Sequence, residues 1–262
     1  MFWVSFCFYE DYRRRLFQNL LFVSNTSAIL NIFILLSSFS HSLSICTYTV
    51  AKERVAYAAA CNPSFVNLMI GTNDIKGIYI KEWGDKSRET FRIPENISYK
   101  NFAKNFDSIL EQLLKNTEAF IAVNTLPPMG ENLECEANKC IRAANSLIKK
   151  SVIKAMETKA GKERIMVVDV YGALAAHILE HKTERQRKIS LKVDEFGEIS
   201  IKIAFKSKIF GVGYNECSEK YGLSVLLDAL HLNDTGAMIV ADKVSEWMTG
   251  IDEREEKGRK AK

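Results

Sequence analysis

The sequence has no glycine before Gly71, although its 262 residues include 13 glycines. It also has no Asp, Glu, Lys or Arg between Leu16 and Ala51, whereas the remainder is rich in charge. In globular domains, about a quarter of all residues are normally charged and several per cent are glycine. The two absences therefore separate an unusual segment, residues 1–50, from an ordinary globular remainder.

Residues 1–50 place three arginines, Arg13 to Arg15, directly before the uncharged run. This order is typical of a signal peptide or signal anchor, although Asn, Gln, Ser and Thr make the run a poor spanning helix. Three interpretations stay open: an anchor or signal at residues 16–50, a buried segment, and a wrongly predicted start of the protein. An anchor or signal predicts a membrane-associated or secreted protein, and otherwise we expect a cytoplasmic one.

The six cysteines include no Cys-x-x-Cys pair, so free thiols are the simplest expectation. The net charge of +4 arises from 36 basic and 32 acidic residues that are interspersed along the chain. A nucleic-acid surface needs clustered basic residues, and we therefore expect no nucleic-acid partner. The one dense charge run, residues 250–262, alternates in sign and is expected to be a solvated, frayed tail.

From residue 51 onward, apolar segments of strand length alternate with amphipathic helical patterns. Strands are expected within 64–71, 119–128 and 164–171, and helices over 99–116, 131–161 (ending at Gly161), 172–181 and 233–248. The alternation predicts a flavodoxin-like, three-layer α/β/α domain over residues 51–249 with a mostly parallel sheet. The segment "KISLKVDEFGEISIKIAF" alternates about "DEFG" and predicts a β-hairpin insertion near residues 188–205.

Two short motifs carry candidate chemistry. "NLMIGTNDI" places Asn73 after the first predicted strand, and functional residues gather at the carboxyl ends of parallel strands. In "LLDALHLNDTGA", Asp228 and His231 lie three residues apart, just before a helix that Asn233 or Asp234 is expected to cap. A carboxylate that accepts a hydrogen bond from one imidazole nitrogen fixes the tautomer of the histidine, so the other nitrogen can take a proton from a nucleophile.

The combination of "GTND" and "DALH", in this order and at this separation, resembles the SGNH hydrolases, also called GDSL esterases and lipases, over about residues 50–249. The resemblance implies hydrolysis of a small ester or lipid-like substrate, with no metal and no cofactor. It implies that His231 is the general base, that Asp228 orients it, and that Asn73 donates a hydrogen bond to the oxyanion.

Two neighbours of Asn73 also receive roles from this resemblance. Gly71 would let the backbone turn tightly beneath the substrate, because glycine tolerates conformations that other residues avoid. Asp74 is expected to stabilise the loop rather than to take part in the reaction.

The Gly-Asp-Ser block that holds the family's nucleophile has no counterpart before "GTND", nor has the glycine of its second block. Ser64 lies at the wrong end of its strand, so no nucleophile is assigned and we expect an inactive or nearly inactive chain. The family's first two strands would fall within residues 1–50. We therefore expect either that the sheet lacks or replaces these two strands, or that the natural protein begins differently. The alternative is a non-catalytic, membrane-tethered binding protein.

Three further polar residues are given structural roles. His177 and His181 have the spacing of a metal pair, but the order is not His-Glu-x-x-His and no third ligand is evident. We expect a partly exposed helix face there. Asp169, at the end of the third strand, is expected to cap a loop rather than to react.

Overall fold

The computed structural model describes residues 55–56, 59–60, 62–189 and 191–260. The segment 1–50, with the predicted anchor or replacement strands, lies outside this part. Three strands, β1 (Phe65–Leu68), β2 (Phe120–Asn124) and β3 (Ile165–Val168), form a parallel sheet in the order β1-β2-β3. The three predicted strands are thus confirmed.

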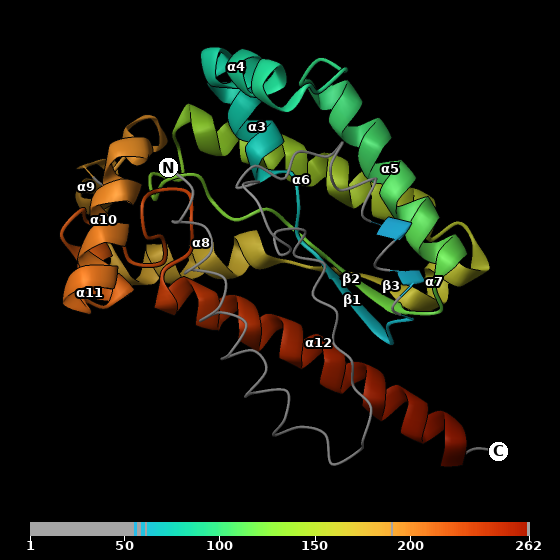
Figure 1. The fold of residues 1–262 in the computed structure, drawn as a ribbon. Coiled ribbons are helices and arrows are strands. Elements are labelled where there is room, and N and C mark those ends of the chain that lie inside the picture. The colour runs from blue at the N-terminus through green and yellow to red at the C-terminus, as the bar shows by residue number, and fades with distance from the viewer. Residues whose placement is uncertain (1–54, 57–58, 61, 190, 261–262) are drawn as a thin grey trace.

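Helices connect these strands and continue the chain after β3 (Figure 1). They are α3 (Thr72–Tyr79), α4 (Lys81–Phe91), α5 (Tyr99–Asn116), α6 (Glu136–Ala155), α7 (Lys159–Arg164), α8 (Val170–His181), α9 (Glu184–Ile189), α10 (Phe196–Phe210), α11 (Tyr214–Glu219) and α12 (Asp234–Lys260), with a short 3-10 turn at Val193–Glu195.

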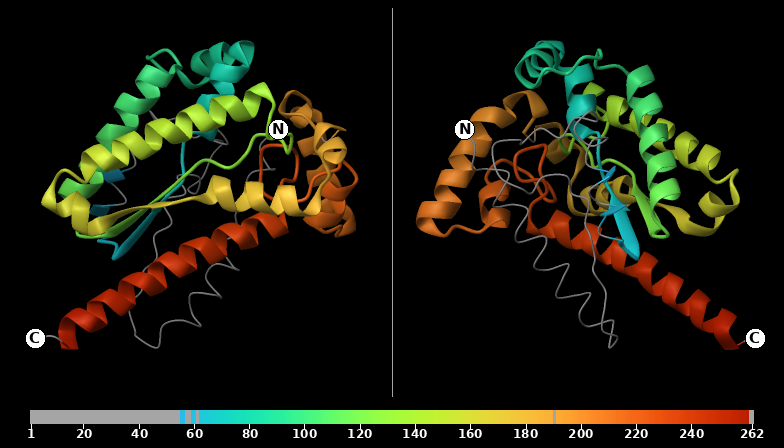
Figure 2. Two further views of the ribbon diagram at one scale, coloured as in Figure 1. Left: turned by 180° about the vertical axis from the view of Figure 1, so that it is seen from behind. Right: turned by 45° about the vertical axis from the view of Figure 1, so that its right-hand side comes forward.

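The sheet is the middle of three layers. Alternate strand residues point to opposite faces. Val66, Ile121 and Val123 pack into one core cluster with α5 and α6, whereas Ala122 and Val168 pack into another with α8 and α12. Figure 2 shows α6 and α12 on opposite sides of the strands. The three-layer α/β/α prediction is confirmed.

Helix α5 follows from its sequence alone. Its residues Phe102, Phe106, Ile109, Leu110 and Leu113 recur at spacings of three and four, and all five are buried against the sheet. The helix begins where the Ser98 side chain accepts a hydrogen bond from the backbone N–H of Asn101 at 3.2 Å. Such local signals suffice to place an element of this length.

The hairpin predicted near residues 188–205 is wrong, because α10 occupies most of this segment. Ser200 and Ile203 lie three residues apart on one helical face, and both are buried. Ile201 and Phe205 lie elsewhere on the helix and are 49% and 57% exposed. The two-residue alternation suggested a strand, but contacts with the 217–228 region stabilise the face that only a helix presents.

The predicted helix over 131–161 is shorter than expected and does not end at Gly161. Helix α6 begins at Glu136 and ends at Ala155, and Gly161 lies inside α7. The Thr158 side chain begins that second helix by accepting the Gly161 N–H at 3.0 Å. A Cβ at Gly161 would lie 2.0 Å from the Ala155 carbonyl oxygen. Glycine is therefore needed for this close approach of two helices.

Helix α12 starts as the sequence predicts, since the Asn233 side chain accepts the N–H of Gly236 at 3.0 Å. It then continues beyond residue 249 through the charged run to Lys260, so the prediction of a frayed tail is wrong for residues 250–260, which are helical. None of the helices within the described ranges is both long enough and apolar enough to cross a membrane.

Candidate active site

The carboxyl ends of the strands are joined by polar side chains. At the end of β2, the Asn124 amide donates to the Leu68 carbonyl of β1 at 3.1 Å. Thr125 donates to the Asp169 carboxylate at 3.0 Å, and Asp169 also accepts the Gly172 N–H at 3.3 Å. Asp169 therefore caps a helix, α8, rather than a loop. These contacts hold the strand ends in register where the candidate site lies.

Gly71 makes the turn from β1 into α3. Its φ of 114° lies in the left-handed region, and a Cβ there would be 2.4 Å from the ring of Phe102. Glycine is therefore required for both conformation and space. Asn73 follows in the first turn of α3, where it is half-buried, so it lies on a helix end and not in a loop.

Asp74 is likewise placed in the first turn of α3 and is buried. A carboxylate at this position interacts favourably with the positive end of the helix dipole. The predicted stabilising role is therefore consistent with its position, although the stabilised element is a helix.

Asp228 and His231 meet inside a tight loop. The carboxylate of Asp228 is completely buried, and its Oδ2 lies 2.8 Å from the Nδ1 of His231, whose side chain is 32% exposed. Oδ1 accepts the backbone N–H groups of Leu230 and His231 at 3.1 and 2.9 Å. The loop closes where the Leu227 N–H donates to the His231 carbonyl at 2.7 Å.

The charges in this pair determine the imidazole tautomer. Burial alone would raise the pKa of Asp228, but attraction to His231 and the hydrogen bonds it accepts lower its pKa overall. Burial alone would lower the pKa of His231, but attraction to Asp228 and their hydrogen bond raise its pKa overall. A carboxylate can only accept, so Nδ1 carries the proton and Nε2 is the nitrogen that can act as a base.

Two residues outside the sequence motifs act on this pair. Ser200 of α10 donates its hydroxyl to Oδ2 of Asp228 and was hidden in the segment predicted as a hairpin. Lys76 lies one helical turn after Asn73, and its charge affects the pKa of His231. The spacing of three from Asn73 is the one clue that could have indicated Lys76.

Lys76 is a buried cation, with only 1% of the residue exposed. Its Nζ lies 3.8 Å from the centre of the Trp83 ring, a cation–π contact. Burial lowers its pKa to about 7, against the attraction of Asp228, which raises it. The charge of Asp228 thus acts on the pKa of Lys76, and the charge of Lys76 acts on the pKa of His231, so Lys76 lies within electrostatic range of the pair.

His177 and His181 lie on α8. Their rings stack with centroids 3.9 Å apart, and Nδ1 of His181 lies 2.9 Å from the His177 carbonyl oxygen. Among the described residues, no group of three or more His, Cys, Asp or Glu side chains could hold a metal ion. The pair stays a structural feature of a partly exposed helix.

The sheet also has a groove at its opposite, amino-terminal edge, with a volume of about 730 Å³. It runs between α6, β3 and α12, and its lining includes Val152, Met166 and Trp247. The lining does not include Asn73, Asp228 or His231. The groove therefore has no part in the candidate chemistry.

A family model described as "GDSL-like Lipase/Acylhydrolase" matches residues 22–244, a range that includes Gly71, Asn73, Asp228 and His231. No curated protein matches the sequence.

Among solved structures, an acetylxylan esterase from Geobacillus stearothermophilus is 14% identical with a TM-score of 0.50, over 76% of this chain and 66% of that one. An alpha/beta hydrolase enzyme from the metagenome of Lake Arreo, Spain, is 14% identical with a TM-score of 0.47, at the same coverage. The chain thus spans slightly less than two thirds of these proteins, and its likeness to the acetylxylan esterase is one of fold.

Proposed function

Because the chain belongs to the GDSL-like lipase/acylhydrolase family, we propose that Asp228, His231 and Asn73 form the remnant of an ester-hydrolase site. The observation that carries this proposal is the 2.8 Å contact between a fully buried carboxylate and an imidazole that reaches solvent. Burying a charge in this way is costly unless the charge is paired. A buried carboxylate paired with an imidazole is a feature of catalytic acid–base pairs.

Each residue has a distinct task in the proposed site. The Nε2 atom of His231 would take the proton of an attacking hydroxyl, and Asp228 would stabilise the imidazolium that forms. The side-chain N–H of Asn73 would donate to the oxyanion of the tetrahedral intermediate. A donor of this kind typically contributes about 3 kcal/mol of transition-state stabilisation.

The proposed chemistry lacks an assigned nucleophile, since no Gly-Asp-Ser occurs in the 262 residues. We therefore expect the purified chain to hydrolyse p-nitrophenyl acetate no faster than buffer does, with His231→Ala at the same rate. Fast hydrolysis that His231→Ala abolishes would contradict the expected inactivity. It would mean that another serine of this chain is the nucleophile, and it would support the role of His231.

The acid–base pair itself can be tested without turnover. We expect an NMR titration of the ring to give His231 a pKa above that of an ordinary histidine, and Asp228→Asn to lower that pKa. The four histidines of the chain allow assignment through His231→Ala. If Asp228→Asn leaves the His231 pKa unchanged, the proposed pair is wrong.

The absence of a nucleophile block favours a second candidate, a binding protein that keeps the pocket without the reaction. A short-chain alkyl phosphonate resembles the tetrahedral intermediate and cannot be hydrolysed as an ester substrate would be. Saturable binding of this compound in a calorimetric titration, weakened by Asn73→Ala, would support the binding role. A titration without saturable heat would contradict it.

A further inference from the structure

The loop that carries Asp228 and His231 is held by a side chain that no motif includes. Glu131 lies in the connection between β2 and α6 and is completely buried. Its Oε1 accepts the backbone N–H groups of Ser224, Val225 and Leu226 at 2.7, 2.8 and 3.1 Å. One carboxylate oxygen therefore binds the three residues that lead into "LDALH".

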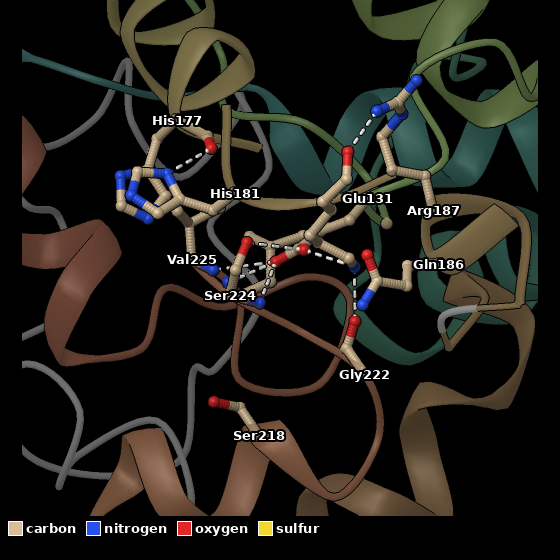
Figure 3. Close-up of polar contacts among 12 residues, drawn as sticks. Glu131, His177, His181, Gln186, Arg187, Ser218, Gly222, Ser224 and Val225 are labelled. Carbon is tan, nitrogen blue, oxygen red and sulfur yellow. Dashed lines mark hydrogen bonds and ion pairs between the residues drawn. The ribbon is translucent and has the colours of Figure 1, made fainter. Parts of the chain in front are cut away.

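The second oxygen of Glu131 has its own partners (Figure 3). Oε2 accepts the Ser224 hydroxyl at 2.8 Å and the Nζ of Lys182, at the end of α8, also at 2.8 Å. The side chain of Lys182 is only 8% exposed, and its Nζ also donates to the Gly222 carbonyl. The charge pair thus ties α8 to both ends of the Gly222–Leu226 stretch.

The connection that bears Glu131 is itself anchored. Asn138 of α6 accepts the Met129 N–H at 3.1 Å and donates to the Gly130 carbonyl at 3.0 Å. The Gly130 N–H donates to the carbonyl of Ala229, between the acid and the imidazole, at 2.7 Å. Ala229 has a φ of 71°, a strained conformation that persists only where its surroundings impose it.

These contacts share one consequence, which is that the backbone before Asp228 cannot shift without breaking bonds to a buried anion. We propose that Glu131 is a positioning residue that fixes the loop geometry in which Asp228 meets His231. The inference deepens the proposed ester-hydrolase site and rests on it. Glu131 acts through the backbone of residues 224–226 and does not touch the imidazole.

The test compares Glu131→Gln with Lys182→Met. Glu131→Gln removes the anion that three backbone N–H groups share, whereas Lys182→Met breaks the ion pair and leaves those three bonds intact. Glu134→Gln is the surface control, because it removes a negative charge from an exposed position three residues after Glu131. All variants are made in the full chain and examined by amide hydrogen exchange and by NMR titration of His231.

We expect Glu131→Gln to accelerate exchange of the Val225 and Leu226 amides at least tenfold and to lower the pKa of His231 toward its ordinary value. Lys182→Met is expected to lower the urea midpoint without moving the His231 pKa, and Glu134→Gln to change neither. A stability loss in Glu131→Gln with unchanged Val225 exchange and unchanged His231 pKa would overturn the proposal. The positioning role is equally contradicted if Lys182→Met lowers the His231 pKa as much as Glu131→Gln does.

The unsubstituted chain supplies a test that does not depend on a variant that folds. The Val225 and Leu226 amides are expected to be protected from exchange as well as those of the central strand β2. Exchange at the rate of exposed loop amides would overturn the proposal. The result is distinguishable from a failure of the acid–base pair, because the effect of Asp228→Asn on the pKa of His231 tests that pair separately.

Discussion

The two halves of the candidate site are built in opposite ways. The half that presents Asn73 depends on one residue, because Gly71 alone permits the left-handed turn beside Phe102. The half that presents His231 is a loop held by hydrogen bonds to Glu131 and Ser200, which are distant in the sequence, and to Asn233, which directly follows the loop. The first half is local and the second is distributed.

This difference teaches how each half should respond to substitution. A local turn fails through a single steric conflict, so one change should remove most of its stability. A distributed loop loses one bond at a time, so each change should have a moderate effect and should alter the electrostatics of the pair. The following predictions test this contrast.

Gly71→Ala should have the largest effect. A Cβ at φ 114° and 2.4 Å from the Phe102 ring combines backbone strain with overpacking, which together should lower the free energy of unfolding by about 3 kcal/mol. Urea denaturation followed by circular dichroism measures this loss. Gly197→Ala is the control, because nothing lies within 4 Å of its Cβ position in α10. A loss at Gly71 no larger than that at Gly197 would contradict the local account.

Asn233→Ala should have the next largest effect. The buried Asn233 side chain caps α12 and also donates to the Ser218 hydroxyl at 2.9 Å and to the Ser224 carbonyl at 3.2 Å. Losing a cap and two buried bonds should lower the free energy of unfolding by about 2 kcal/mol. The exposed cap Thr158 provides the comparison, where alanine should cost about 1 kcal/mol. Equal losses in the two variants would contradict a special contribution of the loop.

Ser200→Ala should destabilise the fold by about 1.5 kcal/mol, because it removes a hydrogen bond to a buried carboxylate. The pKa of Asp228 is lowered in the fold, so its stabilising contribution exists above the unfolded pKa and is lost as pH falls through the folded pKa. Without Ser200 the folded pKa rises, and acid unfolding should begin at a higher pH. Ser207→Ala on the same helix is the control, and an identical acid midpoint in both variants would exclude this role of Ser200.

Lys76→Met should have the smallest effect, a change in titration. The Lys76 charge lowers the pKa of His231, so the variant should raise that pKa in an NMR titration. The raised pKa of His231 means that its attraction to Asp228 stabilises the fold below the unfolded pKa and is lost as pH rises through the folded pKa. The variant should extend this stabilisation to higher pH. Lys81→Met is the control, because it removes a lysine from an exposed ion pair with Asp85, and it should leave the His231 pKa unchanged.

Much of the scaffold could be predicted from short-range patterns. The apolar runs predicted all three strands, and the spacing of Phe102 and Phe106 predicted the buried face of α5. Asp228 and His231 are three residues apart, so their pairing was a local expectation, and the two side chains are in contact at 2.8 Å. Signals of this kind act over one or two turns of chain, where sterics and hydrogen bonding depend on adjacent residues.

The sequence by itself therefore determined the alternation of strands and helices and the acid–imidazole spacing, since each depends on residues close together in the chain. Only the tertiary structure decided that residues 196–210 form a helix and that Ser200 reaches Asp228 across 28 residues. The same holds for Glu131, which bonds Val225 across 94 residues. Contacts at such separations arise from how the layers pack, and no periodicity within a segment encodes them.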